Sequence, residues 1–339
     1  TNNAAVTFDQ ASDGTYAGVM DGSGSLTKSG AGNLTLSGAN SYSGGTTVSA
    51  GTLTGTTTNL QGAITNNAAV TFDQAGDGTY AGAMDGSGSL TKSGTGNVTL
   101  SGANTYSGGT TVSTGTLTGT TTSLQEAIIN NAAVVFSQDN DGTYSGAMTG
   151  TGSLTKSGTG NVTLSGANDY SGGTTVSAGT LTGTTTSLQG AITNNAAVVF
   201  TQDSDGTYSG AMTGSGTLTK SGSGKLTLSG ASDFNGGTTL ASGTLAAAND
   251  TALGSGTIAA TGGTILAGSG ITVSNTMTLT PATAITDAWI NEFHYDNTGS
   301  DVGEFVEVFV GSGFQSGSFD ANLLRIDLYN GSNNTVYDN

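Results

Sequence analysis

The chain has 339 residues, 58 of them glycine, with one proline and no cysteine, and its formal net charge is −17 although only 9% of its residues are charged. The lack of cysteine excludes a disulfide framework and any thiolate metal site or nucleophile. Six basic residues are too few to form a phosphate-binding cluster, so we expect no nucleic-acid partner. No apolar run approaches the ~20 residues that span a bilayer, so we expect no direct membrane insertion.

An internal repeat organises most of the sequence. The segment that begins at Thr1 returns at Thr65, Ile129 and Thr193, so the chain has a constant 64-residue period. We therefore predict three units at 1–64, 65–128 and 129–192, a fourth unit with degenerate coils at 193–284, and a separate module at 285–339.

Short runs bounded by Gly, Asn, Asp or Ser predict β-strands and no helix. In the first copy these runs are 5–8, 15–20, 25–28, 33–36, 46–48 and 52–54. Near-identical units at a fixed period favour stacking of each unit on the next equivalent one. Glycines in the tight turns can adopt positive φ, which sharp corners between strands require. We therefore predict an all-β fold, a parallel β-solenoid of four units with about three coils each, in preference to a sandwich or a propeller.

The alternation within these strands predicts a thin apolar core. In the first copy we expect Leu26, Leu36, Val48 and Leu53 to point inward, together with their equivalents in later copies. A further inner row is expected from Phe8, Phe72, Phe136 and Phe200.

One part of each unit has a family resemblance. The run from Gly24 to Asn40, followed by Tyr42, 44–48 and 51–53, resembles the autotransporter passenger-associated repeat, and the match recurs from Gly88, Gly152 and Gly216. The resemblance implies a bacterial exported protein that forms a right-handed parallel β-helix displayed on the outer surface.

The last part of the chain differs in composition. The runs 289–299 and 301–308 resemble the start of a lamin-tail-like domain of bacterial secreted proteins. That resemblance implies an immunoglobulin-like β-sandwich used as an accessory or interaction module. Because a full sandwich takes ~100 residues, we expect a partial one.

Several polar residues recur once per unit. Asp13, Asp77, Asp141 and Asp205 each precede Gly-Thr-Tyr. A carboxylate ladder for calcium or carbohydrate is one interpretation, but an Asp-Gly turn, with Asp bonded to its own backbone and Gly at positive φ, is favoured. The run 139–142 resembles the opening of a calcium loop, yet Gly150 stands where an EF-hand needs Glu.

Three other repeated sets invite a surface role. Lys28, Lys92, Lys156 and Lys220 are predicted to form a solvated surface row. Tyr42, Tyr106, Tyr170 and Phe234 are expected to stack against the coil surface, with a sugar-binding stripe as the alternative. The repeated threonines suit exposed strand faces, and ice binding is disfavoured because the pattern is expected only on every third coil.

The terminal module contains one candidate metal site. Calcium prefers six to eight oxygen ligands, and Asp296, Asn297, Asp301 and Glu304 supply oxygens close together in sequence. A solvated acidic loop is the alternative. His294, the single histidine, is interpreted as structural.

These features predict a non-enzymatic, extracellular or cell-surface rod with a structural or adhesive role. Its expected partner is a second copy, bound head-to-tail or side-by-side, or a host or neighbouring cell-surface ligand. One alternative is a self-assembling filament subunit, joined by end-stacking or by strand donation at the terminal module. Another is a polysaccharide-binding or polysaccharide-active β-helix, disfavoured because no Arg precedes Arg325.

Overall fold

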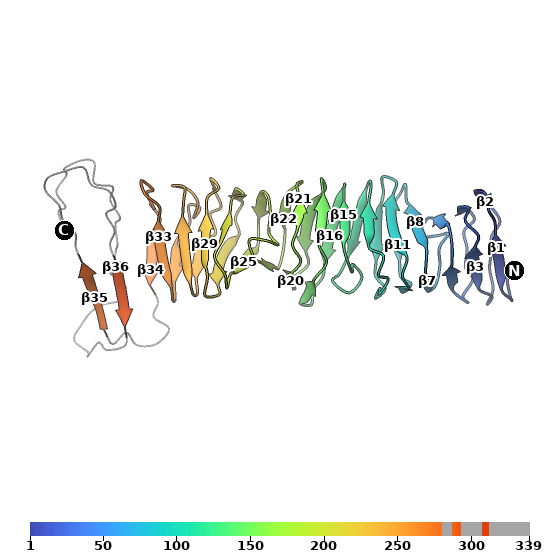
Figure 1. Cartoon of the computed structure of the whole chain (residues 1–339), viewed down its shortest axis with the longest axis horizontal. Helices are drawn as coiled ribbons and strands as arrows, with labels where there is room; N and C mark the ends of the chain where they lie inside the picture. Colours follow the sequence, from blue (N-terminus) through green and yellow to red (C-terminus); the bar gives the residue numbers. More distant parts are fainter. Residues whose placement is uncertain (280–286, 293–306, 312–339) are drawn as a thin grey trace. The chain divides into compact units, whose positions relative to one another are not determined.

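The computed structural model describes residues 1–279, 287–292 and 307–311, and these residues form β-strands and turns without a helix. The chain divides into two compact units, Thr1–Gly190 and Ala191–Asn339. In the first unit the strands stack in register from coil to coil, as the blue-to-green arrows of Figure 1 show. The predicted all-β parallel solenoid is therefore confirmed.

The first unit begins with β1 and ends with β23. Its strands are β1 (Val6–Asp9), β2 (Gly14–Tyr16), β3 (Leu26–Ser29), β4 (Leu34–Leu36), β5 (Thr46–Val48), β6 (Thr52–Gly55), β7 (Ile64–Asn66), β8 (Ala69–Asp73), β9 (Gly78–Tyr80), β10 (Met84–Asp85), β11 (Ser89–Ser93), β12 (Asn97–Leu100), β13 (Thr110–Val112), β14 (Thr116–Gly119), β15 (Ile128–Asn130), β16 (Ala133–Ser137), β17 (Gly142–Tyr144), β18 (Met148–Gly150), β19 (Ser153–Ser157), β20 (Asn161–Leu164), β21 (Asp169–Tyr170), β22 (Thr174–Val176) and β23 (Thr180–Gly183).

The second unit has the same kind of parallel stacking among its own strands. Its strands are β24 (Ile192–Asn194), β25 (Ala197–Thr201), β26 (Gly206–Tyr208), β27 (Met212–Thr213), β28 (Thr217–Ser221), β29 (Lys225–Leu228), β30 (Thr238–Leu240), β31 (Thr244–Ala247), β32 (Ile258–Ala260), β33 (Thr264–Ala267), β34 (Met277–Leu279), β35 (Asp287–Glu292) and β36 (Glu307–Gly311). The last two pair antiparallel, with a shift in register between Ile290 and Glu292.

The coils of the first unit have three faces. The first face begins with β1, β3, β5, β7 and β10, the second runs from β2 through β8 to β21, and the third carries β9, β12, β14, β16, β19 and β22. The first face continues past β10 through backbone bonds at Thr105 and Thr122 toward β17. Parallel register sets the length of a coil, since Val6 pairs with Leu26 and Leu26 pairs with Thr46 on the next coil.

One 64-residue repeat spans three complete coils and then one further face of the next coil. Starting from Val6, the first face is occupied again at Leu26, Thr46 and Ile64, three coils later. Val70, the equivalent of Val6 in the second copy, lies on the second face in β8, and Val134 lies on the third face in β16. The prediction of about three coils per unit is confirmed, but equivalent residues move to the next face with each copy.

The inward positions form the predicted apolar core. Leu26, Val48 and Leu53 are completely buried, and so are their equivalents in the second copy, Leu90, Val112 and Leu117. Phe72, Phe136 and Phe200 are also completely buried, whereas Phe8, in the first coil, is half-buried. Each Phe of this row contacts the Tyr of the following Gly-Thr-Tyr run, as in the 5.1 Å ring separation of Phe72 and Tyr80.

One backbone position in the first unit departs from the repeat. Gly62 and Gly190 lie in the left-handed region with φ of 68° and 66°, and Glu126 occupies the same position in the second copy with φ of 58°. Among the described residues, Glu126 is the non-glycine residue with positive φ. A side chain in this conformation costs roughly 1–2 kcal/mol.

We expect Glu126→Gly to raise the free energy of unfolding by about 1 kcal/mol and Gly62→Glu to lower it by a similar amount. A Cβ on Gly62 would meet no atom closer than 3.8 Å, so the second substitution isolates the backbone cost from crowding. Shifts in the urea midpoint measure both effects. Equal midpoints for the two variants and the parent chain would contradict the assignment of strain to Glu126.

Candidate functional site

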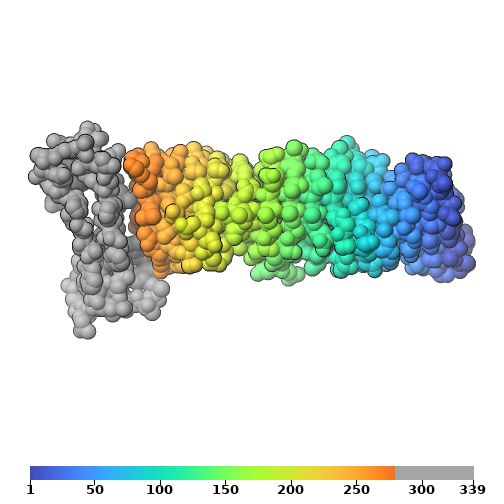
Figure 2. Space-filling view, viewed as in Figure 1, coloured from blue at the N-terminus to red at the C-terminus, as the bar shows by residue number. Residues whose placement is uncertain are grey.

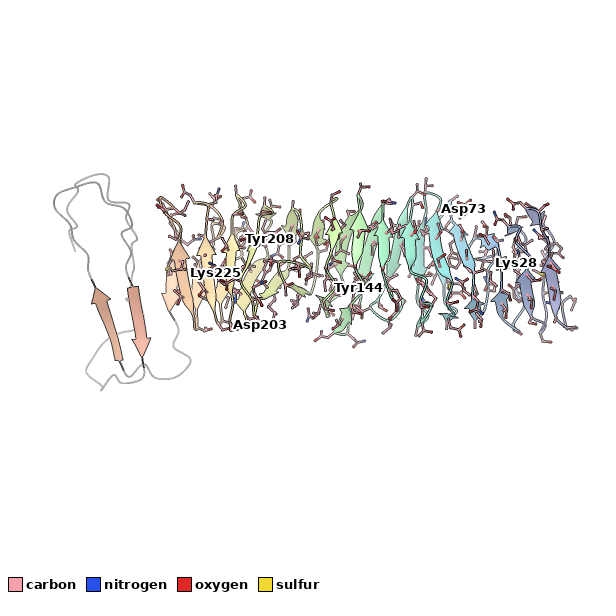
Figure 3. The ribbon with its side chains drawn as sticks, in the orientation of Figure 1. Lys28, Asp73, Tyr144, Asp203, Tyr208 and Lys225 are labelled. Atoms are coloured by element: carbon pink, nitrogen blue, oxygen red, sulfur yellow. The ribbon has the colours of Figure 1, made fainter. Side chains whose placement is uncertain are left out.

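The four repeated lysines are inside the coils, so the predicted solvated row is wrong. Lys28, Lys92, Lys156 and Lys220 are completely buried. Figure 3 places Lys28 among the strands and Asp73 at the margin of the ribbon. Lys92 lies inward because it alternates with Thr91 on the same side as Leu90, and in register it lies between Phe72 and Val112 of the neighbouring coils. The repeated lysines of the first unit also lie on different faces. Lys28 is on the first face, Lys92 on the second and Lys156 on the third.

Each lysine ammonium is enclosed by backbone carbonyls. Lys92 Nζ donates to the carbonyl oxygens of Ser93 and Gly94 at 2.7 Å, and to that of Thr114 in the next coil at 3.1 Å. Three acceptors match the three N–H bonds of an ammonium group. The other three copies have the same arrangement, and we call each one a lysine bracket.

Two glycines shape the bracket around Lys92. Gly94 has φ of 74° and Gly115 has φ of 70°, conformations in which glycine has no steric penalty. A Cβ on Gly115 would lie 2.7 Å from Lys92 Nζ, so the ammonium fills the space that a side chain would need. Burial lowers the pKa of Lys92, and the Asp73 carboxylate opposes the shift.

The repeated Asp residues tie one coil to the next. Asp77 Oδ1 accepts a bond from the backbone N–H of Asn97 at 2.8 Å, and Asp13 and Asp141 do the same with Asn33 and Asn161. The prediction of an Asp-Gly turn is therefore wrong in two details. The carboxylate bonds the neighbouring coil and not its own backbone, and the glycine that follows does not have positive φ. That glycine is needed for close approach, since a Cβ on Gly78 would lie 2.1 Å from Thr57 Oγ1.

The carboxylates do not gather into a metal site. Within the described part of the chain, no three His, Cys, Asp or Glu side chains come together as a metal ion would require. Asp139, in the run that resembles a calcium loop, accepts two bonds from Thr159, and these bonds lower the pKa of Asp139. Asp296, Asn297, Asp301, Glu304 and His294 lie outside the described residues, so the candidate calcium site stays a prediction.

The tyrosine row is buried, which contradicts both a surface stack and a sugar-binding stripe. Tyr42, Tyr106 and Tyr170 are at most 2% exposed, and Phe234 is fully buried. The Tyr106 hydroxyl shares a 2.6 Å hydrogen bond with Thr110 Oγ1, which is also buried. These aromatic side chains are therefore part of the packing.

Outward threonines are more continuous than predicted. On the second face there are six threonines in register on consecutive coils, and Ile129 interrupts the row before Thr149: they are Thr15, Thr35, Thr54, Thr71, Thr91 and Thr111. The expectation of threonine on every third coil is wrong, because the repeat brings a different strand to the same face. The row does not widen into an array, since Ala69 and Ser89 occupy the outward positions beside it on two coils, although Thr52 lies beside Thr54.

The polar interior extends beyond the lysines. Asn130 is completely buried and donates to the Ser153 carbonyl at 2.8 Å, and Asn104 donates to the Ser123 carbonyl at 2.7 Å. Sequence reasoning missed these residues, although strand alternation places Asn130 on the same side as Ile128. Both of these bonds satisfy a backbone carbonyl of a neighbouring coil.

A shallow hollow on the first unit does not supply a binding site of its own. It measures about 330 Å³ and is lined by Thr57, Gln61, Tyr80 and Gly82, among others. Gln61 Nε2 donates to the Thr57 carbonyl and the Tyr80 hydroxyl to that of Gly62. Figure 2 shows the visible face of these coils (blue to green) as a surface without a deep cleft.

Four segments of the chain match the family model of the passenger-associated-transport repeat, at residues 26–58, 90–122, 154–186 and 218–247. The chain carries four passenger-associated-transport repeats. Each matched segment contains a lysine bracket, from the lysine itself to the carbonyl in the next coil. No curated protein and no solved structure matches the chain.

The repeat match confirms the resemblance for those segments. It does not reach β35 and β36, so the lamin-tail-like resemblance stays a prediction. No helix in the described part of the chain is long and apolar enough to cross a membrane. Passenger-associated-transport repeats in a β-solenoid fit a passenger-like cell-surface protein.

We expect Lys92→Ala to lower the free energy of unfolding by about 3 kcal/mol, because three buried carbonyls lose their donor and a cavity forms. The matched control is Lys225→Ala, since the side chain of Lys225 is 43% exposed and its Asp205 partner is 3.7 Å away. Urea denaturation followed by circular dichroism compares the two. Similar midpoints for both variants would show that the bracket does not stabilise the coils.

Alkaline pH is expected to destabilise the coils through the buried tyrosines. Burial raises the pKa of Tyr106 and of Tyr170 to about 12, above the ordinary value of about 10. The stabilisation is therefore complete below pH of about 10 and is lost as the pH rises toward 12, because the unfolded chain ionises first.

Denaturant midpoints measured across this pH range check the expectation. In Tyr106→Phe the loss should be smaller, as Phe234 already occupies the same position in the fourth copy. The lowered pKa of Lys92 acts in the opposite direction only below its ordinary value of about 10.5, because only there does the unfolded chain hold the extra proton. A denaturant midpoint that rises between pH of about 10 and 12 would mean that the buried tyrosines do not determine the pH dependence of stability.

Proposed function

We propose that this chain is a non-enzymatic structural segment of a bacterial extracellular or cell-surface protein, in the manner of an autotransporter passenger. The observation that carries the proposal is the occurrence of four passenger-associated-transport repeats in a parallel β-solenoid. The segment holds adhesive or interaction modules away from the cell, or itself contacts a neighbouring copy or a cell-surface ligand.

The repeated polar residues support a structural role over a catalytic one. The lysine, asparagine and aspartate side chains that recur in each copy bond the backbone of their own or the next coil. Catalysis requires a constellation of groups with divergent pKa values around a reacting atom. These groups are instead distributed over three faces of the first unit, once per copy.

Surface display tests the proposal. The chain is placed between an export signal and an autotransporter membrane barrel in a laboratory Gram-negative host, and antibody binding and protease cleavage are measured on intact cells. We expect the solenoid to be accessible on intact cells and to resist protease there, since its backbone is bonded in sheets. The control is the same fusion without the export signal, and retention inside cells of the exported fusion would contradict the proposal.

Two further measurements narrow the role. Electron microscopy of the purified chain, with calcium and then with a chelator, separates isolated particles, expected of a surface segment, from uniform filaments, expected of a self-assembling subunit. Incubation with acidic and neutral glycans should leave them intact. Turnover of any of them would overturn the non-enzymatic assignment.

A further inference from the structure

The lysine brackets differ in kind from the other ties between coils. Within the described first unit, other side-chain ties between coils at buried positions are made by neutral groups, such as Gln74 Oε1 accepting from the Thr57 N–H and Asn104 donating to the Ser123 carbonyl. The bracket instead places a charged ammonium against carbonyls of two successive coils, for example Gly94 and Thr114 around Lys92. Hydrogen bonds in which one partner is charged are the stronger ones.

In the closed stack the bracket has no surface in contact with bulk water. Lys28, Lys92 and Lys156 have no exposed surface, and glycine corners lie directly against the ammonium. When a coil is pulled from the stack, the ammonium must leave a carbonyl of that coil before bulk water can hydrate it. The resulting state contains a partly unpaired buried charge, which is costly.

The spacing of brackets exceeds the length of a coil. Val70 pairs with Leu90 on the very next coil, whereas the bracket lysines Lys28, Lys92 and Lys156 recur only once in each 64-residue repeat. Each bracket ties two successive coils, so the coil that begins at Ile64 is the one without a bracket between the coils tied at Lys28 and those tied at Lys92. Backbone ladders join all of these coils, and neutral ties such as that of Asn104 also recur once per repeat, so the brackets differ from the other periodic ties at buried positions by their charge.

We propose that the lysine brackets are mechanical stops, at which unravelling of the solenoid under tension pauses once per 64-residue repeat. This inference rests on the proposed function, because a surface segment that joins a cell to a ligand is pulled along its length. A coil without a bracket opens by losing its backbone ladder and its neutral side-chain bonds, one after another, to water. A bracketed coil opens only when the ammonium leaves its carbonyls, so tension accumulates there.

Single-molecule force spectroscopy on the full chain tests this proposal. The chain has no cysteine, so Ala11→Cys and Thr186→Cys, both at exposed positions, attach handles on either side of three brackets. At ~3.4 Å per extended residue, release of one 64-residue interval adds ~220 Å of contour length. We expect increments of this size, and not the ~70 Å of a single coil.

Lys92→Met removes the middle bracket while keeping an unbranched apolar stem. The two intervals between Lys28 and Lys156 should then merge into one release of ~440 Å. The matched control is Lys225→Met, which alters an exposed lysine outside the handles and should leave the pattern unchanged. Circular dichroism verifies folding, and if Lys92→Met does not fold, the increments of the handle-bearing parent decide the question.

Coil-sized increments, a single all-or-none release, or unchanged increments in folded Lys92→Met would each overturn the proposal. The purified chain is used throughout, so such a result leaves surface display untouched. Conversely, a chain that is retained inside cells but releases in 64-residue intervals would contradict the proposed function alone.

Discussion

The fold depends on the cover that each coil gives to the inward positions of its neighbours. A side chain at such a position has another coil above and below it, so a polar group there must find its partners within the stack. Lys92 meets this condition with carbonyls of two coils, and Asn104 does so with a backbone N–H on one side and a carbonyl on the other. The apolar residues then fill the space between these bonded groups. Stability and specificity of stacking thus come from the same positions.

The strands, the parallel stacking and the apolar core could be predicted from the sequence, because period-2 alternation and a strict repeat are local signals. The buried lysine could not be predicted from residue type, since lysine is almost never fully buried without partners. Its partners are backbone carbonyls created by the fold. The alternation of Leu90, Thr91 and Lys92 nevertheless contains the signal, because it places Lys92 on the same inward side of the strand as Leu90.

The arrangement of repeats around the coil was also beyond sequence reasoning. A 64-residue period divides almost evenly into three, which suggested whole coils. The actual coil varies in length, since the steps from Leu34 to Leu53 and from Leu53 to Val70 are both shorter than the step from Val70 to Leu90. The turn at 56–60, where the Leu60 N–H bonds the Thr56 carbonyl four positions earlier, lies within the step from Leu53 to Val70. The same turn recurs at 120–124 and 184–188, so the shortening is part of the repeat, but its effect on the coil appears only in the register of the strands.

The extra face has a consequence for how such a chain can change in length by recombination between its near-identical copies. Loss of one copy from the first unit would move every later strand of that unit onto the preceding face, because each copy advances the coil by one face beyond three turns. A residue that had pointed toward a ligand would then point elsewhere, although its sequence context was unchanged. Loss or gain of three copies together would restore its direction. Variation in repeat number is therefore also variation in orientation.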